Sequence, residues 1–225
     1  MPGEYEGLSK SVIIREVENS LARLKTDYID LYYTHVYDDV TPIDETLDAL
    51  NTLVKEGKVR TIGASNLSAN QLANANKTSE QNGLAKYLVL QSEYTFLHPN
   101  EKSTADTKSH AGKELLDYTA AEGMSFCAYS PVLKGIYTNR EKRNQYYNWH
   151  LFNSEQNLKK LDLVEKLSKD LNITGNQLVL AWMLKKNPQI IPIIGFSKIE
   201  QYMDNSKAYE INLPEEVFRI LEEAE

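Results

Sequence analysis

Residues 28–65 read YIDLYYTHVYDDVTPIDETLDALNTLVKEGKVRTIGAS, and this stretch decides the fold. Its opening is rich in tyrosine and ends at a polar cluster, which predicts a strand over about residues 28–34. Thr41 as N-cap and Pro42 at the first helical position then start a helix that stops at Gly57. The predicted buried face of this helix consists of Ile43, Leu47, Leu50 and Val54. The run VRTIGAS predicts a second strand, and strand starts about 30 residues apart are typical of βα units with a parallel sheet.

The alternation of strand and helix continues along the chain. The opening helix carries an apolar stripe of Ile14, Val17, Leu21 and Leu24. Helices are predicted over residues 11–24, 68–80, 113–122, 158–171, 177–186 and 198–206, with a last one started by Pro214. Further strands are predicted over 87–94, 124–130 and 190–195. An open doubly wound sheet and a (β/α) barrel both fit this order, and we favour the barrel because HVYDDVTP, not a glycine-rich phosphate turn, follows the first strand.

Composition limits the class of protein. The 225 residues are 41% hydrophobic and 25% charged, which predicts one folded domain over residues 1–225. The net charge of −7 argues against nucleic-acid binding. No apolar run is long enough for a membrane span and the first residues do not resemble a signal peptide, so we expect a cytoplasmic protein.

Cysteine and histidine spacing predicts neither a disulfide nor a metal site. Cys127 is the single cysteine, and no paired cysteine and histidine spacings occur. His98, His110 and His150 lie in polar stretches, where we expect solvated side chains without a functional role.

Polar residues gather at the ends of the predicted strands, where both candidate architectures bind ligands. Each of five strands ends in such residues: His35; Ser65 and Asn66; Gln91 and Glu93; Tyr129 and Ser130; Gly195 and Ser197. The sequence therefore predicts a site at this edge of the sheet.

Five segments in order, TDYIDLYYTH, EGKVRTIGASNLSANQL, QSEYTFL, AYSPVLKG and PIIGFSKIEQYMDN, resemble the aldo-keto reductase superfamily over nearly the whole chain. The resemblance implies a (β/α)8 barrel enzyme that uses NADPH to reduce aldehydes or ketones, or that runs the reverse oxidation. It also implies that His35 is the catalytic histidine, which donates a hydrogen bond to the carbonyl oxygen as negative charge develops there. The alternative is a histidine satisfied by neighbouring backbone at a strand end.

The resemblance assigns the nicotinamide to residues on three strand ends. Ser65, Asn66 and Gln91 match the residues that bind the carboxamide, because amides need both donors and acceptors. Ser-Asn before a helix is otherwise typical of an N-cap, and Asn66 serves both roles in our expectation. Tyr129 matches the tyrosine that stacks on the nicotinamide ring, and the alternative is a core tyrosine.

Two loops match the phosphate and adenine segments of the family. The pyrophosphate loop corresponds to Ser130, Pro131, Val132 and Gly135, with Val132 and Leu133 where a Leu-Gly pair is common. Nearby positive charge comes from Lys134, Arg140, Lys142 and Arg143, which a solvated basic run explains equally well. The 2′-phosphate and adenine are assigned to Gly195, Phe196, Ser197, Gln201 and Asn205, with Lys198 at the start of a helix as a further charge. The alternative is an ordinary turn with Gln201 and Asn205 exposed.

Aromatic residues without a clear period fill residues 132–158: Tyr137, Tyr146, Tyr147, Trp149 and Phe152. Such loops commonly shape the substrate pocket of barrel enzymes. A loop that packs its own aromatic side chains over the barrel rim is an equal alternative.

The resemblance also predicts that part of the barrel is absent. About five strands are counted, whereas the family's barrel has eight, so we expect three N-terminal βα units to be missing together with the family's catalytic Asp, Tyr and Lys. Tyr33 is expected to be core packing rather than a substitute. An open sheet exposes its edges and its apolar face, which predicts self-association or a completing partner chain.

Two functions from different classes follow. The first is an NADP(H)-dependent carbonyl reductase, impaired by the truncation. The alternative is a noncatalytic nicotinamide-binding or regulatory subunit. A weaker third possibility, an unrelated barrel enzyme, predicts no nicotinamide binding.

Overall fold

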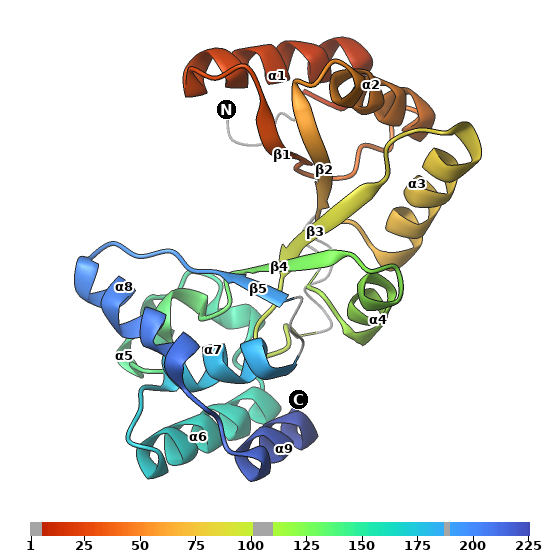
Figure 1. Cartoon of the computed structure of the whole chain (residues 1–225). Coiled ribbons are helices and arrows are strands. Elements are labelled where there is room, and N and C mark those ends of the chain that lie inside the picture. The colour runs from red at the N-terminus through yellow and green to blue at the C-terminus, as the bar shows by residue number, and fades with distance from the viewer. Residues whose placement is uncertain (1–5, 101–109, 187–189) are drawn as a thin grey trace. The chain divides into compact units, whose positions relative to one another are not determined.

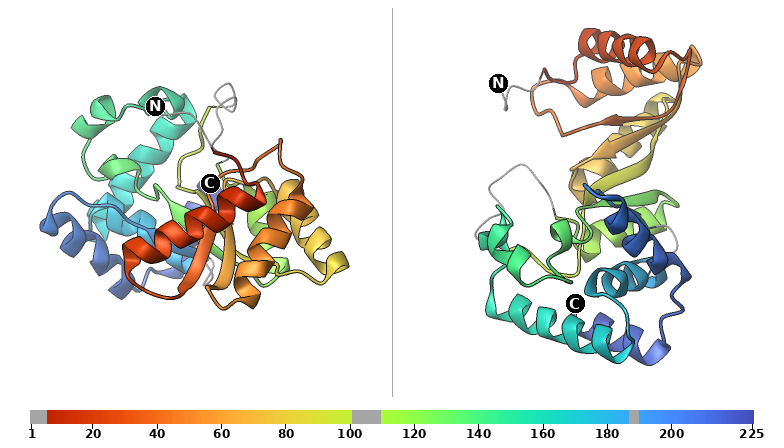
Figure 2. Two further views of the ribbon diagram at one scale, coloured as in Figure 1. Left: turned by 90° about the horizontal axis from the view of Figure 1, so that it is seen from above. Right: turned by 90° about the vertical axis from the view of Figure 1, so that its left-hand side faces the viewer.

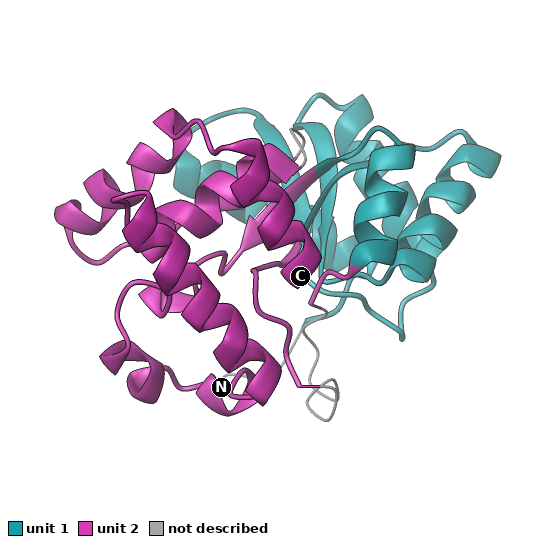
Figure 3. Cartoon of the chain, turned by 90° about the horizontal axis from the view of Figure 1, so that it is seen from below, with its two compact units in different colours: residues 1–91, 113–125 teal, residues 92–112, 126–225 magenta. Residues whose placement is uncertain are grey.

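The computed structural model describes residues 6–100, 110–186 and 190–225. They divide into two compact units, the first made of residues 1–91 and 113–125 and the second of 92–112 and 126–225 (Figure 3). A single domain over residues 1–225 remains a prediction.

The first unit contains parallel strands and the helices between them (Figure 1). Strands β1, β2 and β3 pair in parallel, with Tyr33 opposite Gly63 and Ser65 opposite Gln91. Helices that follow one another in the chain contact each other. The bounds are β1 Ile29–Thr34, β2 Val59–Ser65, β3 Tyr87–Glu93, α1 Lys10–Leu24, α2 Ile43–Lys55, α3 Ala69–Asn82 and α4 Lys113–Ala121.

The buried face of α1 differs from the predicted one. Ile13, Val17 and Leu21 are buried, whereas Ile14 is half-buried and Leu24 is 63% exposed. The buried residues are spaced four apart, which keeps them on one side of the helix. Leu24 misses this face because the helix ends beside it, where Lys25 adopts a left-handed conformation with φ of 55°.

The starts of α2 and α3 correct two further expectations. Pro42 is the N-cap of α2, one residue after the predicted cap, and Ile43 and Val54 are half-buried rather than buried. The N-cap of α3 is Ser68, which forms a capping box with Gln71. Asn66 therefore does not cap this helix.

Gly63 allows a close approach between β1 and β2. The Tyr33 ring lies so near that a Cβ on Gly63 would be 2.6 Å from its Cε1 atom. Tyr33 thus packs against its neighbouring strand, although it is half-buried rather than part of the buried core.

The second unit is built around α7, Gly175–Lys186, whose residues from Gly175 to Met183 are all buried. Strand β4, Ser125–Tyr129, pairs in parallel with β5, Ile190–Ile193. Helices α6 and α9 lie on the side of α7 away from these strands (Figures 1 and 2). The remaining bounds are α5 Glu141–Gln145, α6 Glu155–Asp170, α8 Ile199–Ser206 and α9 Glu215–Ala224. Helix α5 and two short 3-10 turns occupy the stretch predicted to be irregular.

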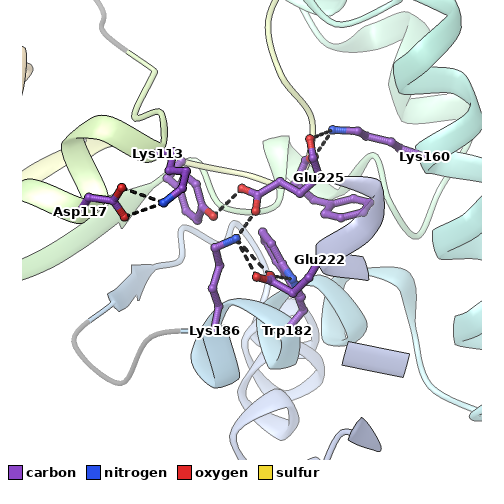
Figure 4. A network of polar contacts seen from close by, with 9 residues as sticks. Lys113, Asp117, Lys160, Trp182, Lys186, Glu222 and Glu225 are labelled. Atoms are coloured by element: carbon purple, nitrogen blue, oxygen red, sulfur yellow. Dashed lines mark hydrogen bonds and ion pairs between the residues drawn. The ribbon is translucent and has the colours of Figure 1, made fainter. Parts of the chain in front are cut away.

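A polar network fastens α9 to its neighbours (Figure 4). The Trp182 indole donates to Glu222 Oε1 at 2.7 Å, and the Lys186 ammonium contacts both Glu222 and Glu225. Lys160, although 3% exposed, donates to the Glu225 carbonyl oxygen at 3.0 Å. Burial lowers the pKa of Lys160, because it disfavours the charged ammonium. The hydrogen bonds of the network offset this cost.

Two histidines are not solvated, contrary to the prediction. Both ring nitrogens of His110 and Nε2 of His98 are buried without a hydrogen-bond partner among the described residues, and the two rings lie 5.4 Å apart. Burial, followed by the nearby His98, lowers the pKa of His110 to about 3. Desolvation disfavours the charged imidazolium, so His110 is neutral. His150 is exposed, as expected.

Apolar side chains on the strands are partly exposed. Leu88 on β3 is 53% exposed, and Ile191 and Ile193 on β5 are 50% and 42% exposed. A partner chain or second copy that covers them remains a prediction. Over the described ranges, no helix has the length and apolar character needed to cross a membrane.

Candidate active site

The predicted site residues of the first unit lie at the carboxyl ends of its three strands. His35 follows β1 and is exposed, Ser65 ends β2, and Gln91 lies opposite Ser65 on β3. The Asn66 amide donates to the Gln91 carbonyl oxygen at 3.0 Å. The parallel register thus brings Ser65, Asn66 and Gln91 together.

Asn66 fixes the backbone at this edge. It is in the left-handed region, with φ of 61°, which costs energy for a residue with a side chain and is common at functional sites. Its Nδ2 donates to the His35 carbonyl oxygen and to Ser65 Oγ, both at 3.0 Å. A ligand carboxamide bound by this Nδ2 would compete with these two bonds.

In the second unit, β4 leads into a strained loop. Ser130, Leu133 and Lys134 have φ of 55°, 43° and 57°, and Gly135 follows with φ of 95°. These left-handed residues turn the chain sharply, although Leu133 and Gly135 are themselves buried. Such conformations persist where the surroundings hold them, and they concentrate at ligand sites.

This loop forms one wall of a pocket of about 780 Å³ that lies wholly in the second unit. Its other walls come from α7 and from the segment that begins after β5. All nine residues that the sequence assigned to phosphate and adenine line it, and their roles there remain predictions: Ser130, Pro131, Val132, Gly135, Gly195, Phe196, Ser197, Gln201 and Asn205. Lys198 does not line it.

The basic residues near the loop separate into two groups. Lys134 and Lys142 line the pocket, whereas Arg140 pairs with Asp162 and Glu165 on α6. Arg143 donates to the Ile136 carbonyl oxygen at 3.3 Å. Among the described residues, no carboxylate forms an ion pair with the Lys134 or the Lys142 ammonium, which suits both cations to an anionic ligand.

Gly135 leaves a space that polar groups surround. A Cβ there would be 3.2 Å from Lys142 Nζ and 3.6 Å from Asn176 Nδ2. Asn176 lies in the first turn of α7, and its Nδ2 donates to Asn205 Oδ1 at 3.3 Å. Sequence reasoning missed Asn176, because no motif marks it and only the packing of α7 brings it to the pocket.

Helix α8 supplies the opposite wall. Gln201 Oε1 accepts from the Ser197 amide at 2.9 Å and from Ser197 Oγ at 3.2 Å. Asn205 is only 6% exposed, so the alternative in which it is simply exposed is wrong. Asp204 accepts hydrogen bonds from Thr174 and Gln177, which ties α8 to the start of α7.

Tyr129 and the loop aromatics lie elsewhere in the second unit. Tyr129 ends β4 outside the pocket lining, and burial, followed by Glu93, raises its pKa. Tyr137, Tyr146 and Phe152 are buried, whereas Tyr147 is 64% exposed. Tyr146 contacts Tyr147 and Phe152 within the loop, whereas the Tyr137 hydroxyl group bonds with Thr95 outside it. Within the described part of the chain, no group of three or more metal-binding side chains occurs.

Comparison with known proteins supports the resemblance. The chain is 33% identical over 226 residues to a putative aryl-alcohol dehydrogenase, C977.14c, of Schizosaccharomyces pombe, covering 96% of this chain and 60% of that protein. It is 32% identical over 230 residues to an uncharacterized oxidoreductase, YrpG, of Bacillus subtilis, covering 98% of this chain and 65% of that protein. The chain thus spans less than two thirds of these relatives.

Solved structures agree. The thermostable aldo-keto reductase Tm1743, crystallised with the inhibitor epalrestat, matches with a TM-score of 0.74 and 29% identity, covering 97% of this chain and 68% of that one. The family model described as Aldo/keto reductase family matches residues 2–225. The chain therefore belongs to the aldo/keto reductase family.

Proposed function

We propose that the chain binds NADP(H) and acts as an oxidoreductase that reduces an aldehyde or ketone to an alcohol. The observation that carries the proposal is the pocket of the second unit. There the Lys142 ammonium lies near Gly135, which has no side chain, and no described carboxylate forms an ion pair with this ammonium. A phosphate group needs such a cation, and the Asn176 and Asn205 amides suit a nucleoside. The volume of about 780 Å³ falls within the usual range for small-molecule pockets.

Cofactor binding and carbonyl reduction are assigned to different residues of the candidate active site. Lys134 and Lys142, which line the pocket at the loop assigned to the pyrophosphate, would hold phosphate. Ser65, Asn66 and Gln91 offer hydroxyl and amide groups to a carboxamide, and Tyr129 offers a flat ring for stacking. A bound reduced nicotinamide would supply a hydride to a carbonyl carbon, and water would supply the proton that completes the alcohol. His35 donates a hydrogen bond to the carbonyl oxygen and stabilises the negative charge that develops there.

Aromatic aldehydes are the substrates to test first. The Schizosaccharomyces pombe relative bears the name of a putative aryl-alcohol dehydrogenase, and Tyr147 presents an exposed aromatic ring, over which the Lys134 ammonium lies at 4.8 Å. An aromatic substrate gains from stacking on such a ring.

The proposal extends to architecture and location. We place the five strands in a (β/α)8 barrel, supported by the solved relative that covers 97% of the chain. A cytoplasmic location and self-association, or completion by a partner chain, belong to the same proposal. Sedimentation velocity of the purified chain tests self-association.

Calorimetric titration tests cofactor binding. We expect saturable binding of NADPH that is tighter than that of NADH, and about tenfold weaker NADPH binding by Lys142→Met, because a charge-assisted hydrogen bond to phosphate is lost. Lys77→Met, which removes an exposed charge from α3 in the first unit, should bind as the unmodified chain does. No binding by a folded chain would refute the proposal.

Turnover separates the two family functions. Oxidation of NADPH that depends on benzaldehyde and disappears in His35→Ala would support a reductase. Saturable NADPH binding without turnover at any enzyme concentration would instead support the noncatalytic, regulatory alternative.

A further inference from the structure

A series of hydrogen bonds runs from the segment after β3 to the loop after β4, within the second unit. The Leu97 amide donates to the Tyr137 hydroxyl oxygen at 3.2 Å. The Thr95 hydroxyl group donates to the Pro131 carbonyl oxygen at 2.7 Å, and its Oγ1 lies 2.6 Å from the Tyr137 hydroxyl oxygen. Because the single hydroxyl proton of Thr95 points to Pro131, the Tyr137 hydroxyl group is the donor in the contact with Thr95.

Both hydroxyl groups of this series are enclosed, since Thr95 and Tyr137 are buried. Burial raises the pKa of Tyr137, so its hydroxyl group keeps the proton that it donates. Hydrogen bonds in series polarise and strengthen one another in a low-dielectric interior. Removing either hydroxyl group would leave a buried partner unpaired.

The series ends beside a strained residue of the loop. Ser130 has φ of 55°, and consecutive residues of the other segment bind the carbonyl groups on both sides of it. The Tyr94 amide donates to the Tyr129 carbonyl oxygen at 3.3 Å, and Thr95 donates to that of Pro131. A left-handed residue with a side chain costs energy and persists only where its surroundings hold it. These two hydrogen bonds supply such a restraint.

Thr95 also joins the two ends of the loop. Pro131 precedes the left-handed residues Leu133 and Lys134, and Tyr137 follows them. The loop residues from Ser130 to Gly135 line the pocket, whereas Thr95 and Tyr137 do not. These two side chains therefore act on the pocket through the loop rather than by touching a ligand.

We propose that Thr95 and Tyr137 are positioning residues, whose hydroxyl groups hold residues 130–137 in the conformation that receives the phosphate groups of the cofactor. This inference rests on the proposed binding of NADP(H). A loop already held in its binding conformation loses little further freedom when the ligand binds, which favours affinity. Without these hydroxyl groups the loop populates other conformations, and the apparent affinity falls with the fraction that remains competent to bind.

Calorimetric titration of variants with NADPH tests the proposal. Thr95→Val removes the hydroxyl group and keeps the β-branched shape. If one loop in about ten remains competent, NADPH binding should weaken about tenfold. Tyr137→Phe should weaken it similarly, and the double variant should bind little worse than either single variant, because both substitutions break the same series. Thr95→Ser retains the hydroxyl group and should bind as the unmodified chain does.

Thr119→Val is the matched control. Thr119 is also buried, and its Oγ1 donates to the Leu116 carbonyl oxygen at 2.9 Å within α4 of the first unit. Its replacement removes a buried hydroxyl group of the same kind but should leave NADPH binding unchanged. Adenosine 2′-monophosphate, which lacks the pyrophosphate, should bind equally to Thr95→Val and to the unmodified chain.

Hydrogen exchange of the ligand-free chain measures the loop without a cofactor. The amides of residues 132–139 should exchange faster in Thr95→Val than in the unmodified chain, and at an unchanged rate in Thr119→Val. This readout does not depend on the proposed function.

Each outcome supports or overturns the proposal. Unchanged NADPH binding or unchanged exchange of the loop in Thr95→Val would overturn the positioning role and leave the proposed function intact. Equal weakening of adenosine 2′-monophosphate would overturn it too, because the damage would then extend beyond the loop. Absence of NADPH binding by the unmodified chain would refute the proposed function, and this inference with it.

Discussion

Replacing Gly175 with alanine should destabilise the second unit strongly. A Cβ at Gly175 would lie 2.7 Å from the carbonyl carbon of Tyr137 and closer still to its oxygen, whereas ordinary contact begins at 3.4 Å. Tyr137 cannot retreat, because its hydroxyl group bonds with Thr95 Oγ1 at 2.6 Å and accepts from the Leu97 amide at 3.2 Å. The backbone itself must move, and we expect a loss of about 3 kcal/mol, the upper end for overpacking.

Urea denaturation measures this loss. With a slope of about 2–3 kcal/mol per molar, the midpoint of Gly175→Ala should fall by about 1 M. Gly112→Ala is the matched control in the same unit, because no described atom lies within 4 Å of the added Cβ and φ is not positive there. The control should be neutral or stabilised by up to about 1 kcal/mol. A midpoint for Gly175→Ala within error of the unmodified chain would refute the packing argument.

Two other perturbations test the packing and the buried charge. Gly63→Ala should lower the free energy of unfolding by about 1–3 kcal/mol in urea denaturation, because its Cβ would meet the Tyr33 ring at 2.6 Å and the Val89 carbonyl oxygen at 3.1 Å. Adding Tyr33→Ala should recover part of this loss. Full additivity of the two substitutions would contradict the contact. His110, with its pKa lowered from 6.5 to about 3, binds fewer protons when folded, so stability is present above pH 6.5 and is lost as the pH falls toward 3. We expect a loss of about 2 kcal/mol between pH 7 and pH 5; an unchanged pH slope in His110→Leu would show that His110 is not its cause.

The order of helices and strands could be predicted because hydrophobic periodicity and the residues that start and stop helices are local signals. The helix starting near Pro42 and the strand VRTIGAS match α2 and β2 closely, since N-cap, proline and glycine signals act within a few residues. The buried stripe of α1 was misassigned because Ile13 and Ile14 are adjacent and equally apolar. Only the tertiary contacts of the helix decide which of the two faces inward.

The two histidines show more clearly that burial depends on tertiary contacts. His98 and His110 stand in polar stretches, and nothing in their neighbours predicts burial. Their ring nitrogens are nevertheless enclosed in the second unit, beside groups from α6 such as Lys160. Burial of a polar side chain depends on residues far away in the sequence, so local composition gives the wrong expectation.

The pocket was predictable wherever its residues occur in short motifs, as they do in the loop that begins at Ser130 and in the segment that follows β5. Its third wall was not, because Asn176 reaches the pocket only through the contact of its neighbour Gly175 with the Tyr137 backbone. That contact sets how closely the start of α7 approaches the loop, and the hydrogen bond from the Asn176 amide to Thr138 fixes it. The residue that packs the unit and a residue that lines the pocket are therefore neighbours for a physical reason. A larger side chain at Gly175 would move the Asn176 side chain, whose Nδ2 lies beside Gly135, out of its place in the pocket wall. Gly175→Ala should therefore weaken NADP⁺ binding even under conditions in which the chain stays folded.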